Sequence, residues 1–182
     1  MTTVRREELP HYGWEDYRRW QGDWELIGGI PYAMTPSPAK RHQVLALAIG
    51  SQLLDRLEDC PDCEVLLDTD WKVASDTVVR PDVAVVCDDD NPARITRTPE
   101  IVFEIVSPAT AVRDEHLKLR LYEAEGVSWY VLVYPDDRRA RIFRWSEGRL
   151  RKVADNAGEP FAFDGVRCPV TLDFGAAFRR LR

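Results

Sequence analysis

Two acidic residues stand in or beside consecutive apolar runs of this chain. Asp82 directly precedes the run 83–86, and Glu104 lies inside the run 101–106. A carboxylate buried in a strand without a partner loses its hydration at a large cost in free energy. If the two strands are neighbours, a divalent cation between the acids would remove this cost and create a reactive site. A Lys or Arg partner would remove it as well, so the pattern leaves both interpretations open.

Metal-dependent hydrolysis is the chemistry that such a pair favours. Oxygen ligands suit Mg²⁺ or Mn²⁺, which keep several waters and take one or two carboxylates. A bound ion of this kind polarises a phosphodiester and lowers the pKa of a bound water. The alternative is structural: Asp82 would cap a turn, and Glu104 would pair with an arginine.

Lys118 is a third candidate for chemistry. It lies in a helical pattern over 110–125, where Asp114, Lys118 and Tyr122 share one face through their four-residue spacing. A lysine between this helix and the sheet could direct its ammonium at an attacking water or at the charge that develops on a phosphoryl group. Taken alone, an ion pair with Asp114 on a solvated face is the simpler interpretation.

The elements that must position these residues are a mixture of helices, strands and hairpins. Gly28-Gly29 joins two short extended runs and predicts a tight N-terminal β-hairpin. Ser37-Pro38 is expected to open a long helix that continues to about Glu58. Further strands are expected at 64–67, 71–73, 77–79, 83–86, 101–106, 129–134, 141–145 and 150–153, whereas the tail 161–172 shows no clear pattern. This order favours an α/β or α+β fold with a mixed central sheet flanked by helices, in one domain over 1–182.

The bulk composition is that of an ordinary globular chain. The chain has 182 residues, of which 45% are apolar, and a formal net charge of -6. No segment approaches the roughly 20 apolar residues of a membrane span, and the N-terminus lacks the apolar core of a signal peptide, so we expect a cytoplasmic protein with no membrane partner. The negative charge argues against binding nucleic acid through a broad basic surface. The basic stretches at 138–141 and 149–152 are more simply explained as solvated edges.

The cysteines give an ambiguous signal. Cys60 and Cys63 have the spacing of half a zinc site or of a redox pair, whereas Cys87 and Cys168 stand alone in the sequence. Two free thiols in a helix-to-strand turn are the favoured interpretation, and a disulfide is not expected in a reducing cytosol. A thiol-based or zinc protein is kept as a third functional hypothesis.

Taken in order, these motifs resemble the Uma-type restriction endonuclease family. The resemblance covers about Glu15 to Arg144, most of the chain. It is carried by Trp24-Glu25-Leu26-Ile27-Gly28-Gly29, His42, Arg80-Pro81-Asp82-Val83-Ala84-Val85-Val86, Phe103-Glu104-Ile105-Val106-Ser107-Pro108, Arg113-Asp114 with Lys118 and Tyr122, and Gly126-Val127-Ser128-Trp129-Tyr130-Val131-Leu132-Val133-Tyr134-Pro135.

The resemblance implies the PD-(D/E)XK nuclease fold, a restriction-endonuclease-like mixed sheet with an N-terminal β-hairpin, and Mg²⁺ or Mn²⁺ as cofactor. In this family Asp82 and Glu104 would be the metal carboxylates, and Ile105 would lend its main-chain carbonyl. The wider superfamily places a lysine two positions after the second acid, where this chain has Val106. In the Uma-type proteins the lysine lies on the following helix instead, which matches Lys118.

Two further residues match the family's site. Glu25 corresponds to an acidic residue of the first hairpin and could face the metal, and His42 corresponds to a helix histidine near the site. The family usually has Asp-Gly at the hairpin turn, whereas Gly28-Gly29 stands here, which removes one carboxylate from the expected site.

The function that follows is a Mg²⁺-dependent endonuclease that hydrolyses phosphodiester bonds of nucleic acid, with DNA favoured as substrate and a homodimer expected. The alternative is a catalytically silent binding or interaction module that kept the nuclease scaffold. The net charge of -6 and the absence of a lysine at position 106 favour this alternative mildly.

Overall fold

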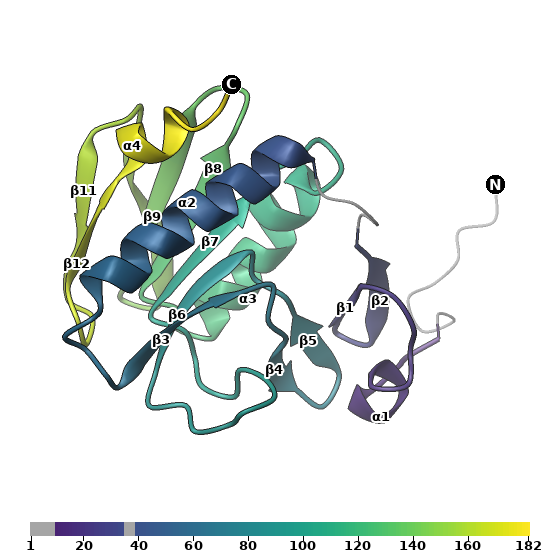
Figure 1. Ribbon diagram of the computed structural model, residues 1–182. Coiled ribbons are helices and arrows are strands. Elements are labelled where there is room, and N and C mark those ends of the chain that lie inside the picture. Colours follow the sequence, from purple (N-terminus) through teal and green to yellow (C-terminus); the bar gives the residue numbers. More distant parts are fainter. Residues whose placement is uncertain (1–9, 35–38) are drawn as a thin grey trace.

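A six-stranded sheet forms the centre of the computed structural model, which describes residues 10–34 and 39–182 (Figure 1). The strand order is β10-β9-β8-β7-β6-β3, and β7 and β8 are its parallel pair, whereas the other neighbours are antiparallel. The strands run over Cys63–Leu67 (β3), Val83–Cys87 (β6), Ile101–Ile105 (β7), Trp129–Tyr134 (β8), Arg139–Ser146 (β9) and Arg149–Asn156 (β10). This is the mixed sheet that the sequence predicted.

A second sheet of four strands carries the predicted N-terminal hairpin. Its order is β2-β1-β5-β4, and its strands run over Trp24–Ile27 (β1), Ile30–Ala33 (β2), Trp71–Ala74 (β4) and Thr77–Val79 (β5). Gly28 and Gly29 have φ angles of 57° and 76°, the left-handed conformation that a two-residue hairpin turn of this type requires. The short helix α1, Trp14–Tyr17, precedes this hairpin.

Helices cover both faces of the central sheet. The long helix α2, Lys40–Arg56, and the short α4, Phe174–Phe178, lie over one face, whereas α3, Leu119–Ala124, lies on the other (Figure 1). The predicted start of α2 at Ser37-Pro38 falls outside the described residues.

The two faces of the sheet bury two separate hydrophobic cores, because successive side chains of a strand point to opposite sides. Val83 and Phe103 pack with α2 in one core. Ala84 and Val102 pack with Tyr122 of α3 in the other. Glu104 is two residues from Val102 and therefore faces the α3 side of the sheet.

The helix that carries Lys118 is irregular. Residues Arg113–Lys118 wind as a π-helix, η2, and the chain continues directly into α3. The predicted α-helix over 110–125 is thus replaced, in its first half, by a wider turn of a kind that is frequent at functional sites.

The tail that the sequence could not place forms a β-hairpin followed by α4. Strand β11, Pro160–Phe163, pairs with β12, Val170–Asp173. Phe163 meets Phe103 and Trp129 edge to face, with ring centroids 5.7 and 5.4 Å apart. Throughout the described ranges, no helix has the length and apolar character needed to cross a membrane.

Candidate active site

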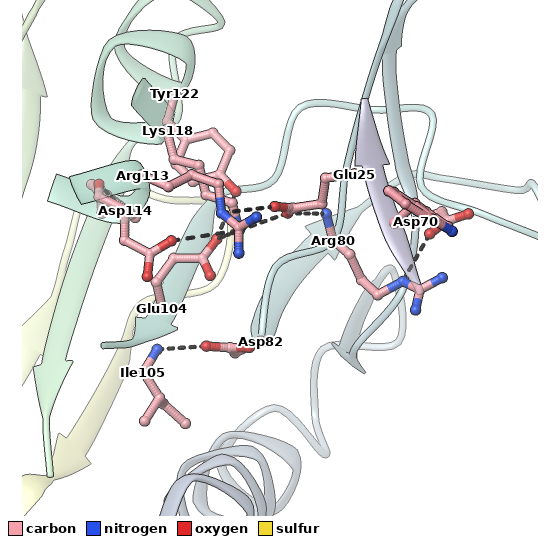
Figure 2. Close-up of polar contacts among 12 residues, drawn as sticks. Glu25, Asp70, Arg80, Asp82, Glu104, Ile105, Arg113, Asp114, Lys118 and Tyr122 are labelled. Carbon is pink, nitrogen blue, oxygen red and sulfur yellow. Dashed lines mark hydrogen bonds and ion pairs between the residues drawn. The ribbon is translucent and has the colours of Figure 1, made fainter. Parts of the chain in front are cut away.

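A buried ion pair joins the central sheet to the helix above it. Glu104 on β7 and Lys118 at the end of η2 are each 2% exposed. Lys118 Nζ lies 2.9 Å from Glu104 Oε1, and the hydroxyl of Tyr122 donates a 2.7 Å hydrogen bond to the same oxygen (Figure 2). Both contacts go to Oε1, so Oε2 of Glu104 takes part in neither.

Glu25 brings a second carboxylate to the same ammonium from a different sheet. It is fully buried on β1, and its Oε1 lies 2.7 Å from Lys118 Nζ. The main-chain N–H of Arg80 donates a 2.9 Å hydrogen bond to this oxygen, and Arg113 Nε lies 3.3 Å from Oε2. Lys118 is therefore held between carboxylates of the two sheets, as Figure 2 shows.

Asp82 stands at the start of β6, beside the end of β7. Its Oδ2 accepts a 2.6 Å hydrogen bond from the main-chain N–H of Ile105, the residue after Glu104. Its Oδ1 lies 3.1 Å from His42 Nε2 at the start of α2. Asp82 is 8% exposed. Because Val83 pairs with Phe103, Asp82 and Glu104, the two acids expected to act together, lie at adjacent strand ends.

One pocket of about 580 Å³ unites these groups. Asp82, Glu104, Ile105, Lys118 and His42 all line it, together with Arg41, Asp68, Arg113 and Asp114. Glu25 does not line the pocket and instead contacts Lys118 from β1. Its contribution in this arrangement is to hold the ammonium in place.

Two buried acids of the pocket, Glu104 and Asp114, have raised pKa values. Burial raises the pKa of Glu104 well above its usual range, and the charges of Asp82, Asp114 and Glu25 raise it further, against the lowering effect of Lys118. Burial likewise raises the pKa of Asp114. The carboxylates Glu104, Glu25 and Asp114 raise the pKa of Lys118 although burial alone would lower it, so this side chain is held as an ammonium.

His42 responds to the same negative charge. Burial lowers its pKa, but the hydrogen bond to Asp82 and the charges of Asp82, Asp68 and Asp114 outweigh burial, and the net pKa is above its ordinary value. Its Nδ1 is buried without a hydrogen-bond partner among the described residues.

The donor atoms of the pocket fit a hard divalent cation. The carboxylates of Asp82 and Glu104 offer oxygen donors, which Mg²⁺ and Mn²⁺ prefer, and Ile105 lines the same pocket. A cation would also lower the raised pKa of Glu104, because it would offset the repulsion from neighbouring acids that adds to the effect of burial.

The geometry differs from the structural alternatives for Lys118, Glu104 and Asp82. Lys118 does contact Asp114, at 3.8 Å, but its side chain is 3% exposed and is not on a solvated face. Glu104 has a lysine partner, not the arginine considered as an alternative. Asp82 does accept a main-chain hydrogen bond, although from the neighbouring strand and not from its own turn.

Arg80, Arg113 and Asp68 belong to the site, although the sequence predicted no role for them. Arg80 forms ion pairs with Asp70 and Asp23, at 2.9 and 2.7 Å, and its main-chain N–H holds Glu25. Arg113 contacts Glu25, and Asp68 lines the pocket. Arg80 could have been recognised as a site residue because it stands in the Arg-Pro-Asp motif beside Asp82. Nothing in the sequence distinguishes Asp68 from the other acids of the chain.

The predictions for the cysteines were wrong. The structure pairs Cys60 with Cys168 and Cys63 with Cys87 as disulfides, and none of these four thiols is free. Cys87 and Cys168 do not stand alone, because the fold brings the end of β6 and the connection between β11 and β12 to the CxxC turn.

A mixed sheet flanked by helices, with two acids at adjacent strand ends and a buried lysine beside them, defines a protein of nuclease fold. A crystal structure described as that of a putative nuclease from Anabaena variabilis superposes with a TM-score of 0.76, covering 94% of this chain and 99% of that chain at 14% sequence identity. This likeness concerns the fold.

Sequence comparison gives the family. The sequence model of the Uma2 family, described as "Putative restriction endonuclease", matches residues 14–171, and the chain belongs to this family. An uncharacterized protein of Synechocystis sp. is 30% identical over 123 residues, and the match spans 63% of each of the two chains.

Proposed function

We propose that this protein is a Mg²⁺-dependent nuclease that hydrolyses phosphodiester bonds in nucleic acid, with DNA as the favoured substrate. The observation that carries the proposal is the position of Lys118 Nζ, 2.9 Å from Glu104 in the pocket that Asp82 also lines. Membership of the Uma2 family and the nuclease fold support the reaction class.

Each site residue has a separate task in this proposal. Asp82, Glu104 and the carbonyl of Ile105 would hold the ion, which supplies Lewis-acid activation of the phosphodiester and of a bound water. Lys118 stays charged and stabilises the negative charge that develops on the phosphoryl oxygens. Glu25 positions Lys118, and His42 positions Asp82 through its 3.1 Å contact.

The cationic side chains around the pocket support a phosphate-bearing substrate. Arg41 and Arg113 line the pocket together with Lys118. These cations offer contacts to a phosphate backbone, although acids outnumber them in the pocket lining and the chain as a whole carries a net charge of -6. Contacts of this kind would position the scissile bond above the acids.

Nuclease assays on Asp82→Ala and Glu104→Ala test the proposal directly. With Mg²⁺ or Mn²⁺ present, we expect both variants to lose cleavage of supercoiled, linear and single-stranded DNA and of RNA while keeping the wild-type circular dichroism spectrum. Asp137→Ala is the matched control, because Asp137 has a 63% exposed side chain and does not line the pocket. Retained metal-dependent cleavage in both folded pocket variants would disprove the assignment.

A catalytically silent module is the second candidate, and one contact favours it. Lys118 already places a positive charge within 3 Å of both Glu104 and Glu25, so an internal ammonium neutralises part of the acid cluster. Isothermal calorimetry distinguishes the candidates: the nuclease should bind Mg²⁺ in a manner lost in Asp82→Ala, and a silent module should bind none.

A homodimer and a cytoplasmic location complete the proposal. Nucleases that cut both strands of a duplex often pair two sites, and closed symmetric dimers are the commonest oligomers. Sedimentation velocity of the full chain, alone and with a short duplex, would measure the oligomeric state.

A further inference from the structure

The four cysteines of the chain meet at one place, away from the acidic pocket. Cys60 lies in the turn after α2, Cys63 begins β3, Cys87 ends β6, and Cys168 precedes β12. The sulfur atoms of Cys60, Cys63 and Cys168 all lie within 4.8 Å of one another, and Cys87 is paired with Cys63. Three sulfurs therefore form a tight cluster, and the sulfur of Cys87 adjoins it through Cys63.

Clustering of this kind goes beyond what two disulfides need. A disulfide requires two sulfurs to meet, and a second bridge can lie anywhere else in the fold. A tetrahedral Zn²⁺ with Zn–S bonds of about 2.3 Å keeps its four sulfurs about 3.8 Å apart, so all of them must share one small volume. The mutual spacing of Cys60, Cys63 and Cys168 is compatible with that requirement.

The backbone around the cluster has the form of a metal-binding turn. Cys60 and Cys63 are separated by two residues, and the N–H of Cys63 donates a 3.1 Å hydrogen bond to the carbonyl of Cys60. Cys63 is the register partner of Cys87 on β6, so a third sulfur enters directly across the strand pair. The connection between β11 and β12 brings the fourth, from Cys168.

Charged side chains hold the same segments together without the sulfurs. Arg167, next to Cys168, lies 2.7 Å from Asp62 in the CxxC turn and 2.7 Å from Asp88, which follows Cys87. The N–H of Asp88 also donates a 2.8 Å hydrogen bond to the carbonyl of Asp62. These contacts do not depend on S–S bonds, so the thiols remain close together when they are reduced.

We propose that Cys60, Cys63, Cys87 and Cys168, when reduced, form a tetrathiolate site that binds one Zn²⁺ ion. Thiolate sulfur is a soft ligand that suits Zn²⁺. Four thiolates leave no coordination position open, so the site would be structural and not catalytic. Cys60 and Cys87 are each 9% exposed, so the ion would be largely shielded from solvent.

The position of the site explains what the ion would do. Cys60 follows the last turn of α2, whereas His42 lies in its first turn, about 21 Å from the last residue of the helix. The metal would join α2, the β3–β6 edge and the C-terminal hairpin, segments up to 108 residues apart in sequence. It would stabilise the scaffold far from the reacting groups.

Metal analysis of the wild-type protein is the first test. The full chain, purified anaerobically under reducing conditions, should contain about one zinc per chain and four thiols that react with a thiol reagent only after chelation. Replacement by Co²⁺ should give the sulfur-to-cobalt charge-transfer absorption of a tetrathiolate site. Chelation should lower the melting temperature by about 5 °C or more, because a structural ion contributes to folding.

Variants distinguish one shared site from two separate bridges. Cys60→Ser/Cys168→Ser should lose zinc completely and leave Cys63 and Cys87 as reactive thiols, and the converse double variant should do the same. Asp82→Ala, with its cysteines intact, should keep its zinc and so exclude binding at the acidic pocket. Reduced wild-type protein that contains four free thiols and no zinc, or anaerobically purified protein that keeps two disulfides, would overturn the proposal.

Discussion

Lys118→Met should destabilise the fold more than any surface change, because Lys118 is the cation between buried acids. Its Nζ lies 2.7 Å from Glu25 and 2.9 Å from Glu104, and its side chain is 3% exposed. Methionine has a similar length and fills the same space without a charge. The substitution therefore leaves the carboxylates of Glu25 and Glu104 buried without their shared partner.

The expected cost follows from this geometry. Removing one partner of a buried ion pair costs about 3–5 kcal/mol, because the remaining charge stays desolvated. In a domain of 150–250 residues, each kcal/mol lowers the melting temperature by about 2–4 °C. We therefore expect Lys118→Met to melt about 6–20 °C below the wild type at neutral pH. Lys152→Met is the matched control, because Lys152 is 51% exposed and should change stability by less than about 0.5 kcal/mol.

The destabilisation should also depend on pH. Without Lys118, burial and the charges of Asp82, Asp114 and Glu25 raise the pKa of Glu104 further above its ordinary value of 4.5. A carboxyl whose pKa is raised in the folded state stabilises the fold at low pH, and this contribution is lost as the pH rises through the folded-state pKa. The melting temperatures of Lys118→Met and the wild type should thus converge as the pH falls from 8 towards 5.

Differential scanning calorimetry of the two lysine variants between pH 5 and pH 8 measures both effects. Lys118 itself should not titrate in this window, because its pKa is raised above 10.5 in the folded protein. If Lys118→Met melts within 2 °C of Lys152→Met at every pH, Lys118 does not compensate the buried charge of Glu25 and Glu104.

Three further predictions test other parts of the arrangement. Glu104→Gln should fold normally but weaken Mg²⁺ binding by at least about 10-fold in calorimetry, because it removes one ligand charge and keeps the shape of the side chain. Tyr122→Phe should lower the free energy of unfolding in urea by about 1.5–3 kcal/mol, because it removes the 2.7 Å hydrogen bond to a buried carboxylate; no loss would mean that this bond is absent in solution. Leu53→Ala should cost about 2–5 kcal/mol, because Leu53 is fully buried, whereas Leu54→Ala, at a 63% exposed position of the same helix, should be nearly neutral; equal effects would contradict the packing of α2.

The sequence predicted the strands that carry the acids because these runs are short, apolar and rich in β-branched residues. Val83 to Val86 and Ile101 to Val106 contain no charge other than Glu104, and both faces of β6 and β7 are buried. The same feature prevents the sequence from predicting which face of the sheet each side chain is on, because a strand buried on both faces does not alternate apolar and polar residues. The side of the sheet that Glu104 faces is set by the separation of the two cores, which is a property of the tertiary fold.

The partners of Lys118 could not be predicted from spacing. Its nearest carboxylate, Glu25, lies on another sheet and far away in sequence. Lys118 lies in a π-helix of six residues, and so short a segment shows no hydrophobic periodicity that distinguishes it from an α-helix. Four-residue spacing related Lys118 to Asp114, yet Asp114 is the most distant of its three acidic partners, at 3.8 Å.

Long-range packing also accounts for the missed C-terminal hairpin and for the cysteine pairing. Strands β11 and β12 are short, and β11 owes its place to the edge-to-face contacts of Phe163 with Phe103 and Trp129, not to its own pattern. Cys168 meets Cys60 because this hairpin packs beside α2. Neither contact has a local signature, since each depends on where the tail docks.

The buried carboxylate of Glu104 needs a positive charge beside it, and a lysine could reach it either from the sheet or from the helix above. Val106 lies two residues after Glu104, on the same side of the sheet, and is buried in the core that Tyr122 shares. A lysine at 106 would approach the acid from the sheet, and it would need room that Val106 and its neighbours fill with apolar contacts. Lys118 reaches the same carboxylate from the helix above, with Glu25 as a second anchor. A positive charge therefore lies beside Glu104 although position 106 is a valine.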